Sequence, residues 1–308
     1  MAPRDSQLTP FARFALGTAQ LGMNYGVANQ SGRPSDEQAR ALVQSAVGQG
    51  LSWFDTAAAY GDSEAVLGRA FTTLGVQDQV NAISKGSILS AEGDSLTSRI
   101  NHSLQRLSVP RLHTWLLHDE KELSAWDERT CREAQSLRDH QRVGFFGVSV
   151  YQPEQAIVAV EKYALTAVQF PASPLDRRFL RNRMANRLAN AGAQLYIRSV
   201  YLQGLCLMEP TQVPSHISRG REAVQTLADF CQRRGLERDQ FCLNYVLQRT
   251  ADTGARMVIG VERLEQLTRN AAILSASLIS PACLDEWDAL WPDDIDDLIL
   301  PFRWNSHR

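Results

Sequence analysis

Four side chains that can move a proton or bind an oxyanion follow short apolar segments of the chain. Asp55 and Tyr60 lie in the segment WFDTAAAYGDSE, Lys85 ends the segment NAISK, and His118 ends the segment TWLLH. A charged residue that closes an apolar run is costly unless it is paired or used for function. These four residues are therefore the first candidates for chemistry.

Together the four groups could deliver a proton to a carbonyl oxygen. The ordinary pKa of a tyrosine is about 10, and an ammonium beside Tyr60 would lower that pKa and make the phenol a better proton donor. A buried Lys85 needs an anionic partner to keep its proton, and Asp55 can supply one. His118 would donate a hydrogen bond to the same oxygen or orient the carbonyl. Such a relay requires a hydride donor on the other side of the carbon.

Each of the four residues alone could have a purely structural role. Whether they form one site depends on the strands and loops that carry them. Eight short apolar segments alternate with longer segments of helical period, such as the one that Ser35 opens as an N-cap. The strand-like segments are 14–20, 51–56, 79–86, 112–119, 144–150, 165–170, 194–200 and 256–261. The helical segments are 35–48, 63–74, 94–107, 128–140, 153–163, 178–190, 219–234 and 262–275.

Strict alternation of strand and helix predicts a parallel sheet with crossover helices. Eight such pairs in 308 residues favour an α/β fold of one closed (β/α)8 TIM barrel over an open, doubly wound sheet. We find no linker that would mark a second domain, so residues 1–308 are expected to form a single barrel. The sites of such barrels lie at the carboxyl ends of the strands, where Asp55, Lys85 and His118 would converge with Tyr60.

Composition limits the classes of function. The chain is 44% hydrophobic and 21% charged with a formal net charge of -2, which disfavours a nucleic-acid or membrane-surface partner. The most apolar stretch, 271–284, is shorter than a membrane helix and is interrupted by serines and Pro281. Five scattered cysteines without a C-x-x-C pair, and a start without a secretory signal, predict a cytoplasmic protein. The acidic tail 285–297 is expected to be an additional solvated segment.

The motifs FDTAAAYGDSE, ISKGS and LLHD, in this order and spacing, resemble the aldo-keto reductases. The resemblance extends from LGTAQLG near the start to VERLEQLTRNA near the end. Members of this family are (β/α)8 barrels that bind a nicotinamide cofactor without a Rossmann domain, which agrees with the lack of a G-x-G-x-x-G motif after any strand. The resemblance implies that Tyr60 is the general acid/base, that Lys85 and Asp55 tune it, and that His118 orients the substrate.

The resemblance also implies a set of cofactor-binding residues. They would contact, in turn, the nicotinamide amide, the phosphates and the adenosine. The set is Gly17, Thr18, Ser149, Gln169, Arg198, Ser199, Gln203, Gly204, Gly260, Arg263, Gln266 and Asn270. Two positions depart from the family pattern, because Val150 replaces a usual Asn and Arg198 replaces an aromatic ring that stacks on the nicotinamide. A guanidinium plane can also stack.

The preference for one nucleotide depends on two adjacent residues. Arg263 could bind a 2′-phosphate, whereas Glu262 could favour the 2′-hydroxyl of NAD. NADP is the family default, so NADP(H) is expected over NAD(H). No metal is expected, because the six histidines form no H-x-H or H-x-x-x-H pair.

The leading hypothesis is an NAD(P)H-dependent oxidoreductase that reduces an aldehyde or ketone, such as a sugar, or runs the reverse reaction. The partner would be a small carbonyl or alcohol, and the oligomeric state stays open. The alternative is a cofactor-binding regulatory barrel with little turnover, which the departures at Val150 and Arg198 keep in play. Tyr25 and three tryptophans of the tail, Trp287, Trp291 and Trp304, would either line the pocket or cap the barrel.

Overall fold

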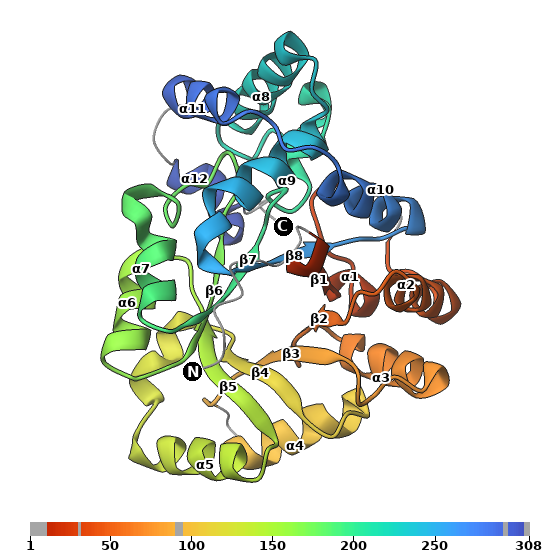
Figure 1. Cartoon of the computed structure of the whole chain (residues 1–308), viewed down its shortest axis with the longest axis vertical. Helices are drawn as coiled ribbons and strands as arrows, with labels where there is room; N and C mark the ends of the chain where they lie inside the picture. The colour runs from red at the N-terminus through yellow and green to blue at the C-terminus, as the bar shows by residue number, and fades with distance from the viewer. Residues whose placement is uncertain (1–10, 30–31, 90–94, 292–294, 305–308) are drawn as a thin grey trace.

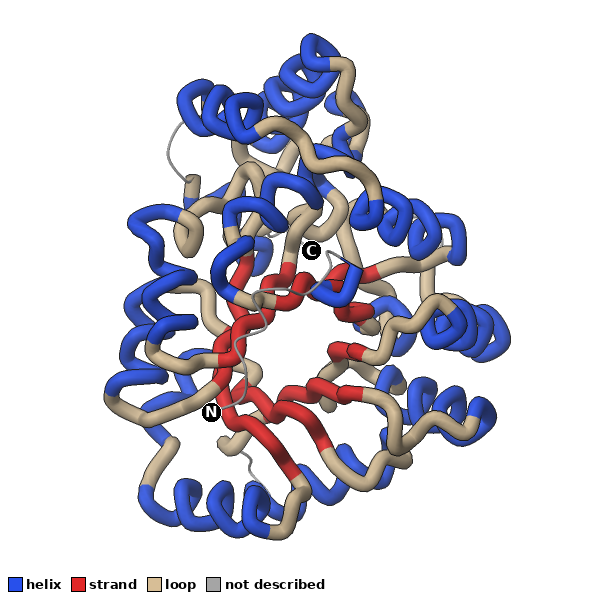
Figure 2. The backbone as a smooth tube through the Cα atoms, in the orientation of Figure 1, coloured by secondary structure: helices blue, strands red, loops and turns tan. Residues whose placement is uncertain are grey.

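The computed structural model describes residues 11–29, 32–89, 95–291 and 295–304, and it contains a closed barrel of eight parallel strands (Figures 1 and 2). The strands follow one another in sequence order around the barrel, and the first pairs with the last. They are β1 (Phe14–Gly17), β2 (Trp53–Asp55), β3 (Asn81–Gly86), β4 (Leu112–Leu117), β5 (Val143–Ser149), β6 (Ala167–Pro171), β7 (Gln194–Arg198) and β8 (Arg256–Gly260). The predicted fold class is confirmed.

Helices surround the barrel on its outside (Figure 1). They are α1 (Ala19–Gly22), α2 (Asp36–Gly48), α3 (Ser63–Leu74), α4 (Leu96–Leu107), α5 (Glu128–Asp139), α6 (Pro153–Glu161), α7 (Met184–Asn190), α8 (Gly220–Arg234), α9 (Arg238–Arg249), α10 (Leu264–Ser275), α11 (Pro281–Leu290) and α12 (Asp296–Ile299). The side chain of Ser35 accepts a hydrogen bond from the backbone N–H of Gln38 and caps α2, as the sequence predicts. Among the described residues, no helix is long and apolar enough to cross a membrane.

Strict alternation was wrong between β7 and β8, where the chain forms two helices, α8 and α9. The sequence signal for α9 was missed because its middle, 241–247, is buried without interruption, and periodicity alone cannot assign a short buried run to a helix or a strand. The predicted helix 178–190 is also shorter, because Asn182 and Arg183 adopt positive φ values of 50° and 54° before α7 begins.

The acidic tail is not simply a solvated segment, because α11 packs firmly on the barrel's outer layer. Trp287 is fully buried, its ring centroid lies 5.2 Å from that of Phe230 in α8, and its Nε1 donates to the carbonyl of Pro174. Trp291 stacks on Trp287. The apolar residues within the acidic pattern therefore close the helical layer, and residues 292–294 of the predicted segment lie outside the described residues.

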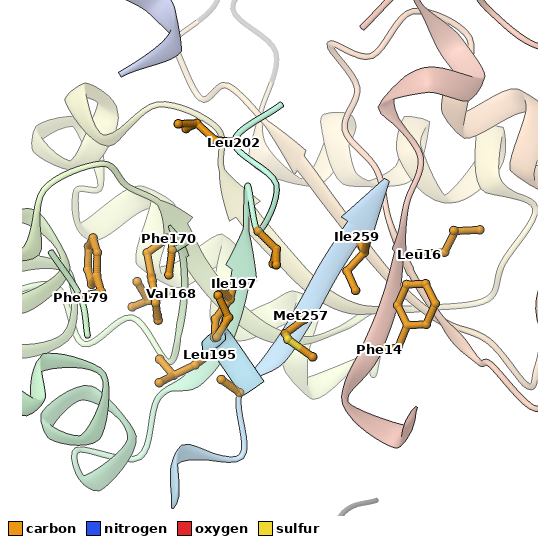
Figure 3. Close-up of a cluster of buried hydrophobic side chains, with 14 of the residues drawn as sticks. Phe14, Leu16, Val168, Phe170, Phe179, Leu195, Ile197, Leu202, Met257 and Ile259 are labelled. Carbon is orange, nitrogen blue, oxygen red and sulfur yellow. The ribbon is translucent and has the colours of Figure 1, made fainter. Parts of the chain in front are cut away.

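Alternation along the strands separates two layers of side chains. Figure 3 shows buried residues of one set, including Leu195 and Ile197 of β7 and Met257 and Ile259 of β8. The intervening residues form a separate small core inside the barrel. That inner core consists of Ala15, Ile83, Leu116, Ala167, Tyr196 and Val258. Continued toward the carboxyl ends, the same inner series reaches Gly17, Asp55, Lys85, His118, Ser149, Gln169, Arg198 and Gly260.

Candidate active site

A buried ion pair lies at the carboxyl ends of β2 and β3. Lys85 Nζ is 2.6 Å from Asp55 Oδ1, and these two residues are 1% and 3% exposed. Lys85 also donates to the carbonyl of Thr56, and Gln169 Nε2 donates to the second oxygen of Asp55 at 2.7 Å. Burial lowers the pKa of Lys85 while Asp55 raises it. The pair is thus held by hydrogen bonds on both sides, as a buried pair requires.

The loop after β2 brings Tyr60 above this pair. Its backbone N–H donates to Ala57, and its carbonyl accepts from Ser63 N at the start of α3. Gly22 at the end of α1 packs so closely beneath the loop that a Cβ there would lie 1.8 Å from the Tyr60 carbonyl oxygen. Glycine at position 22 is therefore a condition for the position of Tyr60.

The ring of Tyr60 contacts two of the other predicted catalytic residues. Lys85 Nζ lies 5.1 Å from its centroid, and the ring of His118 meets it edge to face at 5.4 Å. The structure thus brings all four predicted side chains together at the carboxyl ends of adjacent strands.

The pKa of Tyr60 shifts in the direction opposite to the one we predicted. Burial raises this pKa, the Asp55 carboxylate raises it further, and the cation that lowers it is Arg198. Lys85 donates hydrogen bonds to Asp55 and to the carbonyl of Thr56 and lies over the phenol ring, so its charge is largely matched by Asp55. Tyr60 is consequently a neutral phenol across the physiological pH range.

His118 is neutral as well. Burial, followed by the charges of Lys85 and Arg198, lowers its pKa to about 4. Its backbone N–H donates to Gly86 and continues the pairing of β3 with β4 beyond the last strand residue. A neutral imidazole carries one N–H donor, which suits a group that orients a carbonyl oxygen rather than one that protonates it.

A cavity of about 370 Å³ extends from Asp55 and Tyr60, at its inner end, to α9 and α10, at its outer end. This volume is within the usual range of small-molecule and cofactor sites. Every predicted cofactor residue except Ser149 lines it, as do Asp55 and Tyr60. Lys85 and His118 are not in its lining, although both contact the ring of Tyr60, which is.

Sequence reasoning missed several lining residues, which lie on α1, on the loops after β1 and β7, on α9 and on α10. They are Ala19, Gln20, Gly26, Ala28, Val200, Tyr201, Leu207, Asp239 and Arg269. Tyr25, proposed as a wall or a cap, does line the cavity, and its ring centroid is 6.4 Å from that of Tyr60. Trp287 packs instead against Phe230 on the outer layer of the barrel, and Trp304 donates to the backbone of α12.

The loops after β1 and β7 meet over the cavity. Val27 N donates to the carbonyl of Gln203 at 3.1 Å, and a Cβ on Gly204 would lie 2.6 Å from that of Ala28. The β7 loop is conformationally constrained, since Ser199 and Gln203 have positive φ values of 62° and 55°. Such conformations are concentrated at ligand-binding sites.

The residues at the inner end of the cavity fit a nicotinamide nucleotide. Gln169 donates its Nε2 to Asp55, while among the described residues no donor reaches its buried Oε1. An orphaned buried acceptor is expensive and suits the amide N–H of a carboxamide ligand. Gly17 and Gly260 bring the ends of β1 and β8 close together, since a Cβ on Gly17 would lie 3.2 Å from Gly260 N. Bulkier residues would fill this cradle.

The outer end of the cavity is polar and charged. Tyr201 donates to Asn270 Oδ1 at 2.8 Å, and Gln266 Oε1 accepts from the backbone N–H groups of Glu262 and Arg263 where α10 begins. Burial raises the pKa of Glu262 and Arg263 lowers it.

Two further basic and acidic residues close the outer end. Arg269 is bound bidentately by Asp239, with contacts of 2.8 and 3.0 Å.

The described residues contain no group of three or more histidine, cysteine, aspartate or glutamate side chains arranged to hold a metal ion.

The fold and the site define a (β/α)8 barrel in which Tyr60 lines a cavity whose volume is within the range of small-molecule and cofactor sites. The model of the aldo/keto reductase family matches residues 13–292, and the chain belongs to this family. A protein of Mycobacterium sp. (strain JLS) named aldo-keto reductase is 31% identical over 201 residues, which are 63% of this chain and 70% of that protein. Aldo-keto reductase YhdN of Bacillus subtilis is 25% identical over 176 residues, which are 54% of this chain and 51% of that protein.

Solved structures show the same fold. The aldo-keto reductase AKR11C1 from Bacillus halodurans, in its holo form, superposes with a TM-score of 0.75 at 16% identity and covers 93% of this chain and 95% of its own. The putative aldo-keto reductase PA4992 of Pseudomonas aeruginosa gives 0.64 at 20% identity, over 89% and 93%. Family membership makes the chain an oxidoreductase of the kind that reduces carbonyl groups with NAD(P)H.

Proposed function

We propose that this chain reduces an aldehyde or ketone to an alcohol with NADP(H), or runs the reverse reaction, and that Tyr60 is the general acid/base. The observation that carries the proposal is the contact of Tyr60 with both His118 and Lys85 at the inner end of the cavity. The bound nucleotide would supply or accept a hydride at the carbonyl carbon.

The protein's own residues divide the work on the oxygen of the substrate. His118, being neutral, donates its N–H and fixes the direction of the carbonyl. Tyr60 gives up its proton as negative charge develops on that oxygen, because the raised pKa of the phenol keeps it protonated until then. The phenolate that is left is stabilised by Arg198, the cation that lowers the pKa of Tyr60, and by Lys85, whose Nζ lies over the ring.

The preference for NADP(H) rests on Arg263. This exposed residue lines the outer end of the cavity at the start of α10, and no carboxylate in the described part of the chain forms an ion pair with it, whereas Arg269 is occupied by Asp239. A 2′-phosphate would therefore find one uncommitted guanidinium there. Replacing Arg263 with Met should weaken NADPH binding roughly tenfold or more and leave NADH binding nearly unchanged, as a titration of each nucleotide would show. Equal loss for both nucleotides would contradict the assignment.

The test of the activity is oxidation of NADPH and NADH against a panel of aldehydes, ketones and sugars, with wild type beside Tyr60→Phe. The variant should lose roughly 10²- to 10⁴-fold in kcat, the usual contribution of general acid catalysis. Nucleotide binding should be retained, because Tyr60→Phe keeps the ring that contacts His118 and Lys85 and removes only the phenol oxygen.

Other outcomes of this test lead elsewhere. Tight nucleotide binding without turnover on any compound would favour a regulatory barrel. The presence of Arg198 where many family members have an aromatic ring would agree with that outcome. Binding of neither nucleotide would refute the proposal.

We also propose the cytoplasm as the compartment, because all five cysteines are free thiols and four of them are buried.

A further inference from the structure

Arg198 presents an unneutralised positive charge to the inner end of the cavity. The residue ends β7 and lines the cavity, with its Nε donating to Ser149 Oγ at 3.3 Å and its Nη2 to the carbonyl of Val150 at 3.1 Å. The guanidinium carbon lies 4.2 Å from the ring centroid of Tyr151. All three partners are uncharged, and in the described part of the chain no ion pair joins Arg198 to a carboxylate.

The other ionisable groups around it cancel or are neutral. Asp55 and Lys85 form a pair with no net charge. The lowered pKa of His118 and the raised pKa of Tyr60 keep both groups uncharged near pH 7. The inner end of the cavity therefore carries a net charge of about +1, which belongs to Arg198.

The acid on the β5 side does not line the cavity. The carboxylate of Glu120 accepts from the backbone N–H groups of Tyr151 and Gln152, and Glu120 is not among the residues that line the cavity.

The field of Arg198 reaches side chains on three other elements. Its charge acts to lower the pKa of Tyr25 after β1, of Tyr60 after β2 and of His118 after β4. These residues surround the same space, so a ligand bound there experiences the same field. Low-dielectric walls make such a field stronger than it would be in water.

We propose that Arg198 makes this site bind the reduced nicotinamide nucleotide more tightly than the oxidised one. The inference rests on the proposed function, with the carboxamide of the bound nucleotide held at the orphaned Oε1 of Gln169, which lines the cavity together with Arg198. The oxidised nicotinamide ring carries a positive charge that the reduced ring lacks, so a fixed cation raises the free energy of the oxidised complex alone. A neutral aromatic residue at position 198 would not discriminate in this way.

A thermodynamic cycle gives the functional consequence. Tighter binding of the reduced form raises the reduction potential of the bound nucleotide above that of the free one. A tenfold ratio of the two dissociation constants corresponds to about 30 mV for a two-electron couple. The equilibrium between bound species is then displaced toward alcohol oxidation.

The test measures dissociation constants of NADPH and NADP⁺, by calorimetry, for wild type and matched variants without any substrate. Arg198→Met, which removes the charge but keeps the length, should lower the ratio of the NADP⁺ constant to the NADPH constant about tenfold. Arg198→Lys, which keeps the charge, should hold the ratio within about threefold of wild type. Arg263→Met, at the other end of the cavity, should weaken both forms by the same factor and leave the ratio unchanged.

Two results would overturn the proposal. One is an Arg198→Met variant that loses affinity for both forms equally, and the other is an Arg198→Lys variant that behaves like the Met variant. Arg198→Gln, which is neutral but can still donate to Ser149 or Val150, gives the same comparison if the Met variant does not fold. Failure of wild type to bind either nucleotide would refute the proposed function itself, and that result differs from an unchanged ratio.

Discussion

Asp55 is the residue on which the stability of the inner site depends, because it accepts from Lys85 through one carboxylate oxygen and from Gln169 through the other. Removing a single partner leaves a charge in a region that is almost fully buried. The pair is thus a stability element as well as a part of the proposed proton relay.

Lys85→Met should therefore lower both activity and stability. We expect a loss of about 3–5 kcal/mol in the free energy of unfolding, because Asp55 is left buried without its cation. Urea unfolding measures the stability, and turnover at saturating nucleotide measures the activity. In the double variant with Asp55→Asn the buried charge disappears, so stability should largely return while activity does not. Return of both would mean that Lys85 serves only the fold.

The neutrality of His118 makes a separate prediction about catalysis. Because its pKa is lowered to about 4, no imidazole titration should appear in the profile of kcat/KM between pH 6 and 8. His118→Asn keeps an N–H donor and should retain more activity than His118→Leu. A wild-type inflection near pH 6.5 that is absent from the Asn variant would show that the charged imidazole takes part.

Residue types and strand parity were enough to predict that Asp55, Lys85 and His118 converge, but not the electrostatics of the cluster. Asp55, Lys85 and His118 belong to an inward series that a period of two identifies. The direction of the pKa shift of Tyr60 could not be predicted, because it depends on burial and on Arg198, which is remote in sequence. The lining residues Asp239 and Arg269 were missed because their pairing requires two helices to be placed side by side.

At the scale of elements, α1 fixes the loop that carries Tyr60 by close packing. Gly22 touches the backbone of Tyr60 and Ser63, and a Cβ there would lie within 2.4 Å of Ser63 N. The loop can stay in place only while position 22 has no side chain.

Gly22→Ala should displace the loop and reduce kcat more than it changes nucleotide affinity, with a stability loss of about 1–3 kcal/mol. Gly48→Ala in α2 is the matched control, since a Cβ there meets nothing within 4 Å. It should leave kcat unchanged and raise stability by up to about 1 kcal/mol. Equal kinetic effects from both substitutions would argue against the packing role of Gly22.

The bounds of α3 were predictable from the sequence, whereas α9 and α11 were not. The predicted bounds of α3, 63–74, agree with the structure, because one face packs on the sheet and the other meets solvent. In α9 and α11 the apolar residues pack on neighbouring helices as well as on the barrel. Their burial depends on the tertiary arrangement, which local sequence does not encode.

At the scale of the whole molecule, two partly buried imidazoles make stability depend on pH. Burial lowers the pKa of His113, at the amino-terminal part of the barrel, to about 4, as it does for His118. The unfolded chain binds protons at both residues near pH 6.5 and the folded chain does not. The stabilisation is therefore complete above pH 6.5 and is lost as the pH falls toward 4.

The free energy of unfolding should fall by about 2 kcal/mol per imidazole between pH 7 and pH 5. Urea titrations at several pH values measure this slope. His113→Gln should remove roughly half of the slope in this window, whereas a substitution of the exposed His140 should not alter it. An unchanged slope in His113→Gln would contradict the assignment.

Pairing of β1 with β8 closes the barrel between residues that are about 240 positions apart, and Arg13 reinforces the closure by donating to the carbonyls of Ala255, Leu247 and Thr250. Contacts of such long range pay a large loop-closure entropy and form late in folding. Until residue 260 leaves the ribosome, β1 is an unpaired strand edge that other chains can join. The same hydrogen bonds that remove every edge from the finished barrel therefore leave the nascent chain dependent on its last strand for protection from aggregation.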